Sequence, residues 1–113
     1  MNLQDIIKEL DLKILTDLPK LSESQATTGY ASDMLSCVMA GAKQQSLWVT
    51  LQSHLNIVAV ATLLDLCAII ITEGNTPEAA VIKKAVEEEV ILLSTPESTF
   101  EIAGKLWQMG IRA

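Results

Sequence analysis

The 113-residue chain carries a formal net charge of −6, with half of its residues hydrophobic and 19% charged. A chain of this length can bury a core without disulfides or metals, so we expect residues 1–113 to form one domain. The acidic balance argues against nucleic acid and anionic membranes as partners, because both bind clusters of basic side chains. The high apolar share predicts a homo-oligomer, with a sheet covered on both faces as the alternative explanation.

The sequence shows no targeting or membrane signal. Met1–Asp5 is not a basic region followed by an apolar core, so it does not resemble a signal peptide. The longest apolar runs, Ile57–Ala61 and Leu66–Ile71, are too short to span a bilayer. We therefore expect a cytoplasmic protein. Cys37 and Cys67 lack metal or redox spacing and have apolar neighbours, so we expect both to be buried.

The chain begins with a pattern typical of an amphipathic helix. Residues 3–10 place apolar side chains at helical spacing, and residues 12–15 favour a brief strand. Residues 16–25 contain a proline and many polar side chains, which favours a loop. Residues 26–30 are rich in threonine and favour an extended segment.

A helix, a strand and a further helix are predicted next. Ser32 or Asp33 can cap the first helix and Gly41 can end it. Its buried stripe is expected to consist of Met34, Leu35, Val38 and Met39. Residues 47–51 favour a strand. Residues 56–64 also have strand-like composition, but we predict a helix capped by Asn56, because parallel strands need a crossover between them.

The second half of the chain repeats one strand–helix pattern. Residues 67–72 and 90–93 favour buried strands. Thr76–Glu78 and Thr95–Glu97 favour helix starts, because threonine can cap, proline fits the first turn and glutamate faces the positive end of the helix dipole. The expected buried faces are Val81, Ile82, Ala85 and Val86 in one helix, and Phe100, Ala103, Leu106 and Trp107 in the other. The alternation predicts a three-layer α/β fold, with a parallel or mostly parallel sheet and helices on both faces.

Polar loops follow the expected strands, and ligands of open parallel sheets bind beyond the carboxyl ends of the strands. The candidate ligand-binding residues in these loops are Ser32, Asp33, Gln52, His54, Asn56, Thr72, Glu73, Gly74, Ser94 and Thr95. Helix N-termini are expected at the same edge. The alternative is that these residues serve only as solvated loops and helix caps, which accounts better for Asp33, Asn56 and Thr95 than for Gln52 and His54.

No complete catalytic motif is present. The segment Gly104–Leu106 lacks the residues of a phosphate-binding P-loop, and no nucleophile elbow occurs. His54 is the only histidine, and no motif pairs it with a nucleophile. Asp33 and Glu73 provide one carboxylate per loop, which is a weak pattern for a metal. We expect no catalytic residue, metal or cofactor; an enzyme that uses Asp33, His54 and Glu73 is the least favoured alternative.

Three stretches resemble the DRTGG-domain family in its stand-alone members: Thr28–Ser36, Gln52–Ala61 and Leu93–Leu106. The resemblance covers about residues 1–111. Ala26–Tyr30 takes the place of the D-R-T-G-G motif and keeps only Thr28 and Gly29, which join the candidate ligand-binding residues. The resemblance implies an α/β domain similar to the N-terminal domain of HPr kinase/phosphorylase, of the kind that accompanies CBS-pair pyrophosphatases as a dimer-forming or regulatory domain. The P-loop that HPr kinase activity needs is missing.

These observations predict a non-catalytic regulatory or ligand-sensing module that forms a homodimer. Its expected ligand is a small molecule, for which a nucleotide is one choice, bound at the carboxyl-end loops. Because those loops hold no lysine or arginine, a phosphate would depend on backbone N–H groups alone. The alternative is a protein–protein adaptor, an accessory subunit of a larger enzyme complex with no ligand of its own.

Overall fold

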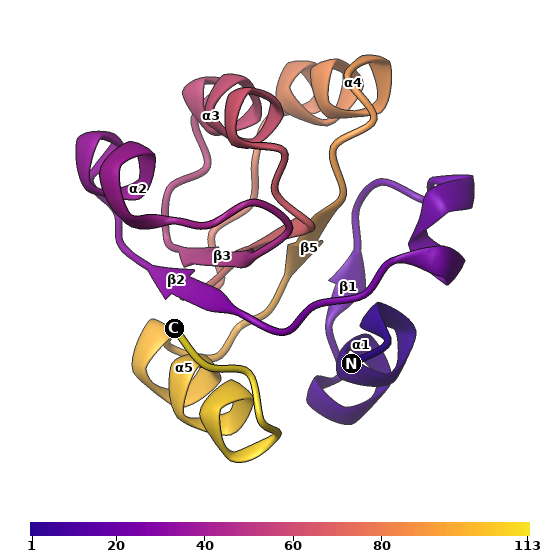
Figure 1. Cartoon of the computed structure of the whole chain (residues 1–113). Coiled ribbons are helices and arrows are strands. Elements are labelled where there is room, and N and C mark those ends of the chain that lie inside the picture. Colours follow the sequence, from indigo (N-terminus) through magenta and orange to yellow (C-terminus); the bar gives the residue numbers. More distant parts are fainter.

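A five-stranded sheet lies between two layers of helices in the computed structural model, which describes all 113 residues (Figure 1). The strands are Lys13–Ile14 (β1), Gly29–Ala31 (β2), Leu47–Thr50 (β3), Ala68–Ile71 (β4) and Leu92–Ser94 (β5). The helices are Leu3–Leu10 (α1), Leu35–Gly41 (α2), Asn56–Leu64 (α3), Ala79–Glu87 (α4) and Thr99–Gln108 (α5), with a 3₁₀ turn at Pro19–Glu23.

The strands are arranged in the order β1-β5-β4-β3-β2, with β1 antiparallel to β5 and the other pairs parallel. From β2 to β5 the chain moves one strand at a time in one direction. The connecting helices α2, α3 and α4 therefore cover one face, and α1 and α5 cover the other (Figure 1). The predicted three-layer, mostly parallel α/β fold is confirmed.

Two hydrophobic clusters fill the spaces between the sheet and its helices. Trp48 belongs to the cluster beneath α2, α3 and α4, whereas its neighbours Leu47 and Val49 belong to the cluster beneath α1 and α5. This alternation follows from the two-residue period of a strand. Both faces of the central strands are buried, which accounts for much of the apolar composition.

Thr16 anchors the segment after β1 to the sheet. Its side chain is almost fully buried, donates a hydrogen bond to the Val90 carbonyl at 3.0 Å, and accepts one from the Leu92 amide at 2.8 Å. The Val90 carbonyl lies just before β5, and the Leu92 amide belongs to its first residue. The hydroxyl thus takes the place of a strand neighbour for groups that would otherwise lack a partner.

The four predicted helix caps are wrong. Helix α4 begins at Ala79 and α5 at Thr99, three and four residues after Thr76 and Thr95. The amide of Thr95 still donates to the Ile71 carbonyl of β4, so the chain is extended there, and residues before proline avoid helical backbone angles. The cap residues of α2 and α3 are Met34 and Leu55, not Ser32, Asp33 or Asn56.

Several side chains predicted to be buried are exposed. They are Met34 at the cap of α2, Cys37 and Met39 in α2, Val86 in α4, and Phe100 and Trp107 in α5. Five residues of these helices do point inward: Val38, Val81, Ala85 and Leu106, which were predicted to be buried, and Ile102, which was not. Cys67 is buried as predicted. None of the helices combines the length and the apolar character that crossing a membrane requires.

Candidate functional site

A hydrogen-bond network ties together the loops at the carboxyl ends of β2 and β3. One carboxylate oxygen of Asp33 accepts hydrogen bonds from the Thr50 hydroxyl at 2.8 Å and from the Leu51 amide at 2.9 Å. The side-chain amide of Gln52 donates to the Asp33 carbonyl at 3.1 Å. Because Thr50 is fully buried, this network fixes the start of the loop Leu51–Leu55 against the sheet.

A second network joins the loop after β4 to the start of α5. The hydroxyls of Thr72 and Thr99 lie 2.6 Å apart, and Glu73 accepts a hydrogen bond from the Thr99 amide at 2.8 Å. The Gly74 amide donates to the Thr95 carbonyl. Asp33 and Glu73, the two carboxylates among the predicted site residues, are therefore each hydrogen-bonded to neighbouring residues of the chain.

A pocket of about 610 Å³ lies between the loops that follow β3 and β4. Its volume falls within the range of small-molecule sites. The β3 loop contributes Leu51, Gln52, Ser53, His54 and Leu55, and the β4 side contributes Asn75, Thr76, Glu78, Ala80 and Val81. The two walls are joined by a hydrogen bond of 2.6 Å from the Asn75 side chain to the Leu51 carbonyl.

The pocket presents both hydrogen-bond donors and acceptors. The Nδ1 atom of His54 accepts a hydrogen bond from the Asn56 amide at 3.3 Å, so in the neutral ring Nε2 carries the proton and can donate. The hydroxyls of Ser53 and Thr76 and the carboxylate of Glu78 make no hydrogen bond within the chain and can bind a ligand. Its apolar wall includes Leu55 and Val81.

The electrostatic character of the pocket is acidic. Glu78 is the only charged side chain among the lining residues, and no lysine or arginine is among them. A phosphate would meet a carboxylate without a basic side chain to balance it. The pocket therefore suits a neutral or cationic group with hydrogen-bonding edges. No three His, Cys, Asp or Glu side chains are grouped closely enough to hold a metal ion.

Only Gln52 and His54 of the predicted site residues line this pocket. Asn56 is the first residue of α3 and is not among the lining residues. Ser32 accepts a hydrogen bond from the Met34 amide, and Ser94 pairs with Lys13 in the sheet. All three of these residues lie outside the lining of the pocket.

Sequence reasoning did not predict that Thr76 and Glu78 line the pocket, because it assigned both to a helix start. The proline at position 77 holds the preceding residue extended, and the helix begins only at the Ala79–Ala80 pair. A predicted loop that ran on to the start of α4 at Ala79 would have placed both polar side chains beside the loop after β3.

The DRTGG domain family model matches residues 5–109, which is nearly the whole chain. The chain belongs to the DRTGG domain family. No curated protein matches the sequence of this DRTGG domain.

A solved structure shares the fold of this DRTGG domain. It is the crystal structure of the CBS and DRTGG domains of the regulatory region of Clostridium perfringens pyrophosphatase, complexed with the activator diadenosine tetraphosphate. The TM-score is 0.74 at 16% sequence identity, and the match covers 91% of this chain and 44% of that chain. The present chain therefore spans less than half the length of the pyrophosphatase region.

The family's signature segment lies away from the pocket in this DRTGG domain. Thr28 and Gly29 lie at the amino end of β2, and the Gly29 amide donates to the Arg112 carbonyl at 3.0 Å. A Cβ atom at Gly29 would lie 3.2 Å from a methyl group of Ile111. The contacts of Thr28 and Gly29 hold the C-terminal segment against the edge of the sheet.

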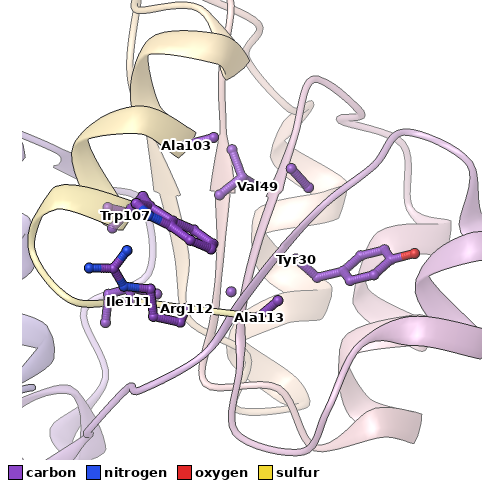
Figure 2. A pocket seen from close by; sticks show the side chains of 10 residues that line it. Tyr30, Val49, Ala103, Trp107, Ile111, Arg112 and Ala113 are labelled. Atoms are coloured by element: carbon purple, nitrogen blue, oxygen red, sulfur yellow. The ribbon is translucent and has the colours of Figure 1, made fainter.

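A second, apolar hollow of about 160 Å³ lies where α5 faces β2 in this DRTGG domain (Figure 2). Trp107 and Arg112 lie on one side, with the guanidinium carbon 4.5 Å from the centre of the indole ring. Val49 and the backbone of β2 form the other side. Eight of its ten lining residues are hydrophobic, so this hollow differs chemically from the polar pocket.

Proposed function

We propose that this protein is a non-catalytic regulatory domain that forms a homodimer and binds a small ligand in the pocket between the β3 and β4 loops. Membership of the DRTGG family supports a regulatory role, because the related domain of the C. perfringens pyrophosphatase lies in a regulatory region. The observation that carries the ligand proposal is the pocket itself, which combines a hydrogen-bonding wall with an apolar one.

The pocket chemistry defines the class of ligand. The Nε2–H of His54 and the hydroxyl of Ser53 can donate to ring nitrogens or carbonyls, and Glu78 can accept from an amino or hydroxyl group. A nucleobase or ribose offers such edges together with an apolar ring face. A nucleotide fits if its base and ribose enter and its phosphates stay in solvent, because no basic side chain lines the site.

The test is a titration of the whole chain, followed by ¹H–¹⁵N NMR, with adenosine, guanosine, AMP and diadenosine tetraphosphate. We expect shifts at residues 51–55 and 75–81, with nucleosides binding at least as tightly as nucleotides. Glu78→Gln and Ser53→Ala should each weaken binding about threefold or more, the loss expected for one hydrogen bond. Glu9→Gln, an exposed change on α1, is the matched control and should bind like the wild type.

Absence of shifts with all four compounds would refute a nucleoside ligand. Binding that requires phosphate and ignores Glu78→Gln would place the ligand elsewhere. The adaptor function is the second candidate, and the exposed aromatic side chains Phe100 and Trp107 favour it. Stable co-purification of a different protein, together with no NMR shift at the pocket residues for any of the four compounds, would support the adaptor in place of the ligand sensor.

A further inference from the structure

Helix α5 carries two apolar faces, and only one of them is buried. Ile102 and Leu106 point into the core. Phe100 and Trp107 are 88% and 54% exposed, and Ala103 and Gly104 lie between them in the sequence. These four residues have the spacing i, i+3, i+4, i+7, so they form one continuous stripe on the helix surface. A helix that is apolar on two sides is typical of a helix covered on two sides.

The order of side chains in the stripe is symmetric. It is large, small, small, large, about a point between Ala103 and Gly104. A second copy of α5 laid antiparallel about that point brings Phe100 level with Trp107 of the other copy, at both ends of the contact. The small residues then meet at the centre, where they let two helices approach closely. This is the self-complementary arrangement that a two-fold axis requires.

The hollow beside Trp107 fits this arrangement. It lies between α5 and β2, is mainly hydrophobic, and opens next to the residue that Phe100 of a second copy would face (Figure 2). Phe100 itself has no such cover within its own chain, since almost its whole surface is exposed. One chain therefore carries both the projecting ring and a recess for it.

Charges along α5 also favour an antiparallel copy. Glu97 and Glu101 lie at the start of the helix, and Lys105 and Arg112 lie toward and beyond its end. Lys105 already forms an ion pair with Glu97 of its own chain. An antiparallel copy brings the acidic start of each helix beside the basic end of the other, whereas a parallel copy would align like charges.

We infer that the exposed face of α5, formed by Phe100, Ala103, Gly104 and Trp107, is the homodimer interface of this protein, with Phe100 of each copy seated beside Trp107 of the other. The inference rests on the homodimer of the proposed function and gives its location. The four aromatic rings would bury roughly 600 Å² in total. That is about half of a small stable interface, and the surrounding edge of β2 and the C-terminal segment can supply the rest.

Gly104 gives a selective test. A Cβ atom at this position meets nothing within 4 Å in the single chain, so an added side chain starts into open space. In the dimer the same side chain would occupy the closest point of approach. Sedimentation equilibrium of the whole chain should show a dimer for the wild type and at least a hundredfold weaker association for Gly104→Glu. Trp107→Ala should weaken association at least tenfold.

Ala40→Glu is the matched control, because it adds the same charge to an exposed position of α2 on the opposite face of the sheet. It should remain dimeric, and all variants should keep the far-UV circular dichroism of the wild type. A second readout is covalent: in a Cys37→Ser background, Ala103→Cys should form a disulfide-linked dimer on oxidation, because the two copies meet at this residue. Gln108→Cys, on the polar flank, should crosslink far less.

The outcomes separate the interface from the function. A wild-type dimer that Gly104→Glu and Trp107→Ala leave intact would overturn the α5 interface but keep the homodimer. A wild type that stays monomeric up to about 1 mM would overturn both the interface and the homodimer. Neither result touches the ligand pocket, which nucleoside titration tests by itself.

Discussion

Replacing Thr16 by valine should test how strongly the segment after β1 is held to the sheet. The two side chains have nearly the same shape, so the change removes the hydroxyl and little else. Without it, the carbonyl of Val90 and the amide of Leu92 lose their buried partner. Each unpaired buried group costs about 2 kcal/mol, so the two groups together cost about 4 kcal/mol, and the added methyl group returns about 0.8 kcal/mol. The expected loss is therefore about 3 kcal/mol.

Urea unfolding followed by circular dichroism measures this loss directly. A loss of about 3 kcal/mol is a large share of the 5–15 kcal/mol typical of a domain, and it should lower the Tm by roughly 12 °C or more. Thr16→Ser keeps both hydrogen bonds and should lose only about 1 kcal/mol. The reasoning fails if Thr16→Val loses less than Thr16→Ser, or if the two variants lose equal stability.

Two further predictions concern packing and pH. A Cβ at Gly41 would lie 2.6 Å from the ring of Tyr30, so Gly41→Ala should lower the free energy of urea unfolding by about 1 kcal/mol. In a Tyr30→Ala background the ring is gone, and the same change should raise stability by a few tenths of a kcal/mol, because alanine is the better helix former. Burial raises the pKa of the Cys67 thiol from 9.0 to about 11, so the folded chain binds this proton more tightly than the unfolded chain does. The stability that this protonated thiol contributes is complete below pH 9 and is lost as the pH rises toward 11. The difference in unfolding free energy between wild type and Cys67→Ala should therefore shrink across that window by on the order of 2 kcal/mol. A difference that stays constant with pH would contradict this assignment.

The sequence was a good guide to the elements whose pattern has one solution. The apolar residues of α1 have a single inward face, and all four of them are buried as predicted. The segment 56–64 forms a helix with the predicted bounds, although its composition suits a strand, because the crossover between β3 and β4 demands one. Connectivity decided this case more firmly than local propensity.

The candidate site was predicted less well, because its polar residues also serve the fold. Asp33 and Glu73 stand in the expected loops, but hydrogen bonds to Thr50 and Thr99 engage them. Which polar groups remain available depends on how neighbouring loops meet, and those distances are set by tertiary structure. The Thr-Pro-Glu segments add a further ambiguity, since threonine before proline suits both an extended loop and a helix cap.

The error in α5 carries information of its own. The predicted buried face joined Phe100, Ala103 and Trp107 to Leu106, whereas the fold buries Ile102 and Leu106. Helical spacing alone cannot choose between two overlapping apolar stripes. The outer stripe pairs the two largest exposed side chains of the helix with a glycine that nothing in the single chain requires. Glycine within a helix is destabilising by roughly 0.5–1 kcal/mol relative to alanine. The proposed α5 interface would account for both the exposed aromatic rings and the glycine, so the stripe that fails as a core prediction supports the proposed homodimer.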